Sequence, residues 1–135
     1  MKFPLVMKLK FSWMSEAGNR IIPFCDSSVV KEDGVIPLAC LLMDDGGQGY
    51  LGTVPWIDEG IAKIYAAIKD AAVVAAWGRE AWEAKISSNG VEIYSLHDEG
   101  YSEMLTISMF LHALLAWKEF LQSNPELGVI REVDI

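Results

Sequence analysis

The chain has 135 residues, 52% of them hydrophobic, and a formal net charge of -8. This length and apolar content suit one folded domain, here expected over residues 1–135, and exclude an intrinsically disordered chain. The excess of carboxylates excludes a nucleic-acid binder, because phosphate recognition needs clustered Lys and Arg.

Alternating apolar residues predict a half-buried strand from Leu5 to Trp13, with lysine and serine at positions between them. The next segment, Glu16 to Arg20, predicts a turn. A short apolar run from Ile21 to Phe24 is interrupted by Pro23, which a sheet tolerates at its edge. We therefore expect an opening pair of strands whose second member lies at an edge.

The segment from Val35 to Met43 is apolar throughout apart from Pro37, which predicts a strand with little solvent exposure. It ends at an acidic, glycine-rich loop, Asp44 to Gly49, whose composition is typical of a turn. Tyr50 to Val54 predicts a further short strand.

From Ile57 the apolar spacing becomes that of an amphipathic helix begun by Asp58. The predicted core face consists of Ile57, Ile61, Ile64, Tyr65, Ile68 and Ala72. The end of this helix stays open, because Ala71 to Trp77 could extend it or begin a strand, and Gly78 could terminate it.

The dipeptide Asn89-Gly90 lies between two alternating segments and is typical of a tight β-hairpin turn. A two-residue turn at this position places Trp82 opposite His97, so the imidazole would stack on the indole.

Thr106 predicts the N-cap of a second helix, which Asn124-Pro125 ends. Its core stripe consists of Ile107, Phe110, Leu111, Leu114, Trp117 and Leu121. The segment from Gly128 to Ile135 is a tail of undetermined structure. Together these elements predict an α+β fold with a mostly antiparallel sheet packed against two helices.

Carboxylates occur in two long stretches that contain no Lys or Arg, residues 32–62 and 86–117. A block of one sign projects a negative field that attracts basic protein surfaces. A tryptophan without an assigned face is, if exposed, a candidate anchor within such a surface. The candidate partner-binding residues are therefore Asp44, Asp45, Asp58, Glu59, Asp98, Glu99, Glu103 and Trp56.

His97, Asp98 and Glu99 form the densest titratable cluster, and an imidazole beside carboxylates can act as a general base or a metal ligand. Neighbours at a strand end point in different directions, however, and stacking on Trp82 explains the histidine without chemistry. The acidic loop after Met43 has the wrong ligand spacing for calcium. We therefore predict no catalytic residue, no metal and no cofactor.

Lysines at positions 2, 8 and 10 interrupt any signal peptide, and no segment reaches the about 20 apolar residues of a membrane-spanning helix. The two cysteines, Cys25 and Cys40, suit a reducing compartment, where each acts as a small hydrophobe. We predict a cytoplasmic protein without a membrane partner.

The second half of the chain combines two short strands, an acidic loop and an aromatic helix. These elements carry Trp82-Glu83-Ala84, Val91 to Leu96, Tyr101, Phe110, Trp117 and Phe120-Leu121. In this arrangement, the segment from Trp82 to Leu121 resembles small bacterial immunity proteins of polymorphic toxin systems. The resemblance implies a small, acidic, non-enzymatic α+β protein that binds and blocks a toxin, and it transfers no contact residues.

We expect an acidic, non-catalytic module that occludes a basic protein partner, with a toxin as the partner that the resemblance implies. Two alternatives stay open: a small hydrolase or metal-dependent enzyme using His97 with nearby carboxylates, and a homo-oligomeric assembly protein with a contact along Val73 to Trp77. An exposed aromatic ringed by carboxylates favours the binding module. A deep pocket holding His97 favours the enzyme, and a large exposed apolar patch favours the oligomer.

Overall fold

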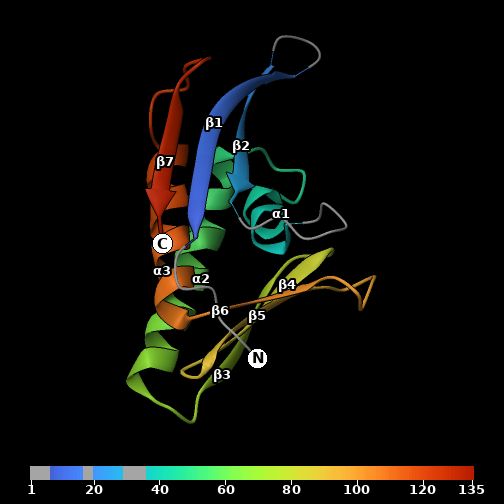
Figure 1. Cartoon of the computed structure of the whole chain (residues 1–135), viewed down its shortest axis with the longest axis vertical. Helices are drawn as coiled ribbons and strands as arrows, with labels where there is room; N and C mark the ends of the chain where they lie inside the picture. The colour runs from blue at the N-terminus through green and yellow to red at the C-terminus, as the bar shows by residue number, and fades with distance from the viewer. Residues whose placement is uncertain (1–6, 17–19, 29–35) are drawn as a thin grey trace.

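The computed structural model describes residues 7–16, 20–28 and 36–135. Within these ranges the chain forms two antiparallel sheets and three α-helices, which confirms the α+β class (Figure 1). The strands form two sheets, one above the other in Figure 1, and helices α2 and α3 run behind the upper sheet and beside the lower one. Helix α3 contacts strands of both sheets and so joins them.

The first sheet has β1 (Lys8–Glu16) at its centre, between β2 (Arg20–Ser27) and β7 (Ile130–Asp134). The alternation predicted for the opening strand is confirmed from residue 7 onward, because Met7, Leu9, Phe11 and Trp13 are all buried. Leu5 and the predicted turn residues 17–19 lie outside the described residues.

The position expected for Pro23 is also confirmed, because β2 is an edge strand. Strand β7 forms in the segment whose structure the sequence left undetermined. It pairs with β1 from Lys8 opposite Asp134 to Ser12 opposite Ile130. The central strand of this sheet is thus paired on both sides.

The strand predicted from Val35 to Met43 is wrong in the described part of that segment, which is helix α1 (Pro37–Met43). A continuous apolar run is compatible with a buried strand or a buried helix. Pro37 sits in the first helical turn, where its missing N–H costs nothing and its fixed φ suits the helix. The strand predicted from Tyr50 to Val54 is wrong as well, because a 3-10 turn, η1 (Leu51–Thr53), leads directly into the next helix.

Helix α2 (Val54–Lys69) begins before the predicted start, and Asp58 lies inside it rather than capping it. Its buried face also differs from the prediction, because Tyr65 and Ile68 are about half exposed, at 52% and 50%. The buried residues of α2 are Ile57, Gly60, Ile64 and Ala67. After Lys69 the chain does not continue the helix but forms a strand, β3 (Val74–Gly78).

The second sheet has the order β3-β4-β5-β6, with β4 at Trp82–Ser87, β5 at Gly90–Ser95 and β6 at Ser102–Leu105. The predicted hairpin exists, but its register is wrong by two residues. Gly90 pairs with Ser87 instead of lying in the turn, so Trp82 faces Ser95 and not His97. Gly90 has a φ of 148°, which favours glycine where the turn enters β5.

Helix α3 (Ile107–Leu121) confirms its predicted cap, because the Thr106 hydroxyl accepts the Met109 N–H at 3.0 Å. Most of the predicted stripe is buried, whereas Ile107 and Leu111 are only partly covered. The stripe meets aromatic residues of β1: the Trp117 and Phe11 ring centroids are 5.1 Å apart in an edge contact.

Candidate functional site

A cavity of about 520 Å³ lies beside β2, between that strand, the end of α1 and the loop that leads into α2. Side chains of α3 also contribute to its wall. Its lining residues are Glu16, Arg20, Ile21, Ile22, Pro23, Phe24, Leu42, Met43, Asp45, Gln48, Gly49, Tyr50, Leu51, Gly52, Thr53, Trp117 and Leu121. The volume lies in the range of about 300–1,000 Å³ that is common for ligand pockets.

The cavity combines apolar walls with a few charged groups. Among its lining residues, Phe24 is 37% exposed and Leu51 is 61% exposed. Glu16 and Arg20 form an ion pair with each other, with 3.8 Å between Oε2 and Nε. Asp45 is the second carboxylate of the lining, and it is one of the residues predicted to bind a partner.

The acidic loop holds Asp45 in a defined turn. The Asp45 carboxylate accepts the Gly47 N–H at 2.8 Å, and the Asp44 carboxylate accepts the Gly46 N–H at 3.0 Å. Gly46 and Gly47 have positive φ, 61° and 78° respectively, which residues with a Cβ rarely adopt. The loop is therefore a carboxylate-braced turn, as its composition predicted.

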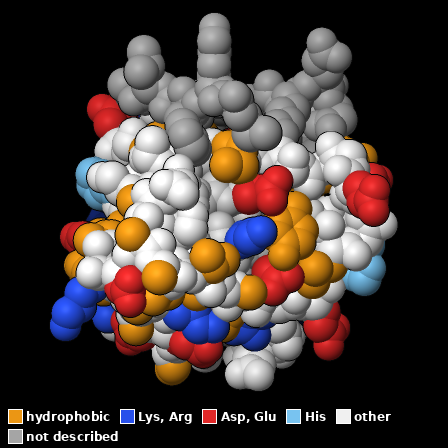
Figure 2. Space-filling view, turned by 90° about the horizontal axis from the view of Figure 1, so that it is seen from below, with side chains coloured by type: hydrophobic (Ala, Val, Ile, Leu, Met, Phe, Trp, Pro, Cys, Tyr) orange, Lys and Arg blue, Asp and Glu red, His pale blue; other side chains and the backbone are white. Residues whose placement is uncertain are grey.

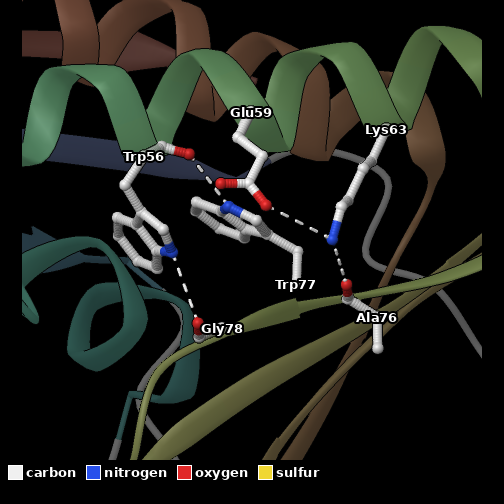
Figure 3. Close-up of polar contacts among 6 residues, drawn as sticks. All are labelled: Trp56, Glu59, Lys63, Ala76, Trp77 and Gly78. Atoms are coloured by element: carbon white, nitrogen blue, oxygen red, sulfur yellow. Dashed lines mark hydrogen bonds and ion pairs between the residues drawn. The ribbon is translucent and has the colours of Figure 1, made fainter.

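Trp56, the predicted exposed anchor, is instead packed inside a stack. Its ring centroid lies 4.0 Å from that of Trp77 (Figure 3). The Arg79 guanidinium covers the Trp56 ring at 4.3 Å. The Trp56 Nε1 donates to the Gly78 carbonyl at 3.3 Å, while Trp77 Nε1 donates to the Trp56 carbonyl at 2.9 Å. Trp56 therefore fixes α2 to β3 and does not offer a free aromatic surface.

Lys63 makes a second link between α2 and β3. Its Nζ donates to the Ala76 carbonyl at 2.7 Å and lies 3.6 Å from the Glu59 carboxylate (Figure 3). The Arg79 N–H donates to the Trp82 carbonyl of β4, so by the alternation of an antiparallel pair the Ala76 and Gly78 carbonyls face away from β4. Side chains of α2 thus occupy acceptors that another strand would need in order to pair with this edge.

Several predicted partner-binding carboxylates are engaged within the protein. Asp58 forms an ion pair with Lys118 at 2.6 Å, from a distant part of the chain. Glu103 is only 7% exposed, and its carboxylate accepts the Leu38 N–H at 3.1 Å, at the start of α1. Glu103 is therefore a structural residue, and its assignment to an exposed surface is corrected.

Asp98 and Glu99 are exposed in the loop after β5, as expected for surface carboxylates. The expected stacking of His97 on Trp82 is wrong, because the changed register carries His97 beyond the strand pair. His97 is exposed, and its Nε2 lies 2.9 Å from the Glu80 carbonyl. It is not part of the cavity lining.

The cysteines are both free thiols. Burial raises the pKa of Cys25 to about 12, which makes its thiolate scarce at neutral pH. Burial also raises the pKa of Cys40.

Among the described residues, no group of three or more His, Cys, Asp or Glu could hold a metal ion.

On one face of the protein the charges are mixed rather than gathered. In the view of Figure 2, acidic side chains are scattered among basic and apolar ones. Long-range ion pairs such as that of Asp58 explain part of this, because stretches without local cations meet cations from elsewhere in the fold. In the part of the chain that the structure describes, no helix is long and apolar enough to cross a membrane.

The chain matches no family model, no curated protein and no solved structure. The cavity and its charges are therefore the features that bear on its function. Sequence reasoning found Asp45 but missed Phe24 and Leu51, which have no distinguishing pattern of their own. Only the packing of β2 against the loop brings these three residues to one cavity.

Proposed function

We propose that the protein is a non-catalytic binding module for a basic protein partner, with the cavity beside β2 as the contact site. The observation that carries this proposal is that exposed Phe24 and Leu51 line the same cavity as the Asp45 carboxylate. Protein interfaces are typically built this way, with aromatic or aliphatic anchors at the centre and polar groups at the rim.

The net charge supports a basic partner. A formal charge of -8 accelerates encounter with a positively charged protein and disfavours acidic ones. Exposed carboxylates away from the cavity, such as Asp98 and Glu99, contribute to this steering without touching the partner. The contact itself depends on the cavity.

The finer proposal is that the protein acts as an immunity protein and that its partner is a basic toxin, such as a nuclease. In this mechanism the carboxylates occupy the positions of substrate phosphates on the toxin and block its active surface. The resemblance of Trp82 to Leu121 and the net charge support this proposal.

The two alternatives have less support. The enzyme alternative depends on His97, which does not line the cavity. The oligomer alternative depends on the segment from Val73 to Trp77, where Val74 is exposed but Trp77 is buried. In addition, Lys63 occupies the outward Ala76 carbonyl, which opposes edge-to-edge pairing of two copies through β3.

The test uses basic proteins whose genes lie next to the gene of this protein. Each is purified and passed over the immobilised protein at low and high salt. We expect one of them to bind, with an association rate that falls as salt rises. Asp45→Lys should slow association and speed dissociation of this complex. Asp70→Lys, with the same charge change at the far end of α2, should affect association only slightly.

Equal dissociation rates for the wild type and Asp45→Lys would contradict the cavity as the contact site. If none of these basic proteins bound, or if the complex ignored salt, the basic partner itself would be the wrong conclusion. For the finer proposal, the bound toxin should lose its activity in a stoichiometric mixture with the protein.

A further inference from the structure

The edge of β2 next to the cavity offers few backbone N–H donors to an added strand. Pro23 has no N–H, and the Cys25 N–H donates to the Met43 Sδ at 3.3 Å. The Ser27 N–H donates to the Asp26 carboxylate at 2.8 Å. The Ser28 N–H donates to the Lys8 carbonyl of β1, so by alternation the backbone groups at positions 23, 25 and 27 point away from β1. A partner strand added at this edge would therefore find no available N–H donor on β2 at these three positions.

The lack of donors at this edge favours recognition by side chains that enter the cavity. The cavity, at about 520 Å³, has room for more than one side chain. Phe24 and Leu51 provide apolar contact surface, and Trp117 and Leu121 of α3 form further apolar wall. An aromatic or aliphatic group would thus be covered on several sides.

The charges of the lining favour a cation as the second group. The lining contains two carboxylates, Glu16 and Asp45, and one guanidinium, that of Arg20. Arg20 already has Glu16 as its partner, and its side chain is 71% exposed. An anionic ligand would have to compete with Glu16 for Arg20, whereas a cation finds the Asp45 carboxylate without breaking an ion pair.

We infer that the cavity receives two side chains of the partner, one aromatic or aliphatic and one Arg or Lys, without pairing of the partner's backbone to β2. This inference rests on the proposed function and specifies how the partner is recognised. The apolar side chain packs against Phe24 and Leu51. The aliphatic stem of the Arg or Lys packs beside that side chain, and its charged end contacts the Asp45 carboxylate.

The probe is the capped dipeptide acetyl-Phe-Arg-amide, titrated into the isotopically labelled protein and followed by NMR. It is compared with the same dipeptide carrying citrulline, the uncharged isostere of arginine, or glutamate. We expect amide shifts at Phe24 and Leu51 and binding of the arginine probe roughly 2- to 5-fold tighter than that of the citrulline probe, as for a solvent-exposed ion pair. The glutamate probe should bind weakest.

Matched variants locate the charge preference. In Asp45→Asn the arginine and citrulline probes should bind equally, whereas Asp70→Asn should retain the preference of the wild type. Asp70 lies just beyond the last residue of α2, and Thr53 of the cavity lies just before the first. A helix of this length separates them by roughly 24 Å, so the control changes the net charge identically but not the site.

A fourth probe carries an N-methyl group on the arginine amide, which removes the backbone donor that could pair with a β2 carbonyl. We expect it to bind as well as the unmodified dipeptide, because no strand pairing is involved. Loss of binding on N-methylation, equal binding of arginine and citrulline, tighter binding of glutamate, or no shifts at millimolar concentrations would each overturn the inference. A basic partner that still bound through Asp45 would leave the proposed function intact in these cases.

Discussion

Replacing Gly60 with alanine should destabilise the protein, although alanine is the better helix former. Gly60 lies on the buried face of α2, directly against the Trp77 indole. A Cβ placed on it would stand 2.6 Å from the indole Cε2 and 2.9 Å from Cζ2. Trp77 cannot easily move away, because its ring stacks on Trp56 and its Nε1 donates to the Trp56 carbonyl.

Two effects of opposite sign decide the result. Alanine in a helix interior gains about 0.5–1 kcal/mol over glycine. Overpacking of a core contact costs about 1–3 kcal/mol. We therefore expect Gly60→Ala to lower the free energy of unfolding by about 1 kcal/mol, with a fall in Tm of about 4 °C.

Urea denaturation measures the change, and near-ultraviolet circular dichroism reports the indole stack. Gly52→Ala is the control, because its Cβ would lie 3.4 Å from the Gln48 Cβ, an ordinary contact, and its stability should not fall. In the background of Trp77→Leu, which removes the obstructing ring, Gly60→Ala should become neutral or stabilising. The reasoning is refuted by a Gly60→Ala protein that is more stable than the wild type with an unchanged spectrum.

Substitutions at three further residues test the core and its buried polar groups. The Trp117 Nε1 is buried and has no hydrogen-bond partner among the residues that the structure describes. In urea denaturation, Trp117→Phe should therefore stay within about 1 kcal/mol of the wild type while Trp117→Ala costs about 3–5 kcal/mol, and equal losses would contradict this. Glu103→Ala should cost about 1.5–3 kcal/mol, because the Leu38 N–H loses a charged acceptor, and Glu103→Gln should cost less; if the two variants were equally stable, the hydrogen bond would not be the cause. The pKa of Cys25 is about 12 in the folded protein against an ordinary 9.0, so the thiol ionises first in the unfolded chain. Its contribution to the free energy of unfolding is therefore complete below pH 9 and is lost as the pH rises toward 12. Between about pH 9 and 10.5 the wild type should therefore lose about 2 kcal/mol more than Cys25→Ala, and parallel pH profiles would show that the thiol is not responsible.

The elements that the sequence predicted well are those in which local pattern and tertiary burial agree. The opening strand alternates apolar residues from Leu9 to Trp13, and the fold buries that face. The cap of α3 is a local interaction of Thr106 with the turn that follows it, so it could be predicted without the rest of the protein. By contrast, α1 is short and apolar on all sides, and such a segment carries no period that distinguishes helix from strand.

The same distinction separates the predicted from the missed parts of the candidate site. Asp45 stands in a glycine-rich acidic loop that is recognisable by composition alone. Phe24 and Leu51 come from a strand and a 3-10 turn that meet only in the folded protein. Local charge patterns also misplaced Glu103, because they give no indication that the start of α1 would bury its carboxylate.

The pairing of β1 with β7 has a consequence for synthesis of the protein. Strand β1 is made early and β7 late, yet β1 lies at the centre of its sheet and needs both neighbours. Until β7 has left the ribosome, β1 and β2 are a two-stranded hairpin, which is marginally stable in water. One side of β1 therefore stays open while the rest of the chain is translated, and a chaperone that shields this open side would help most during that interval.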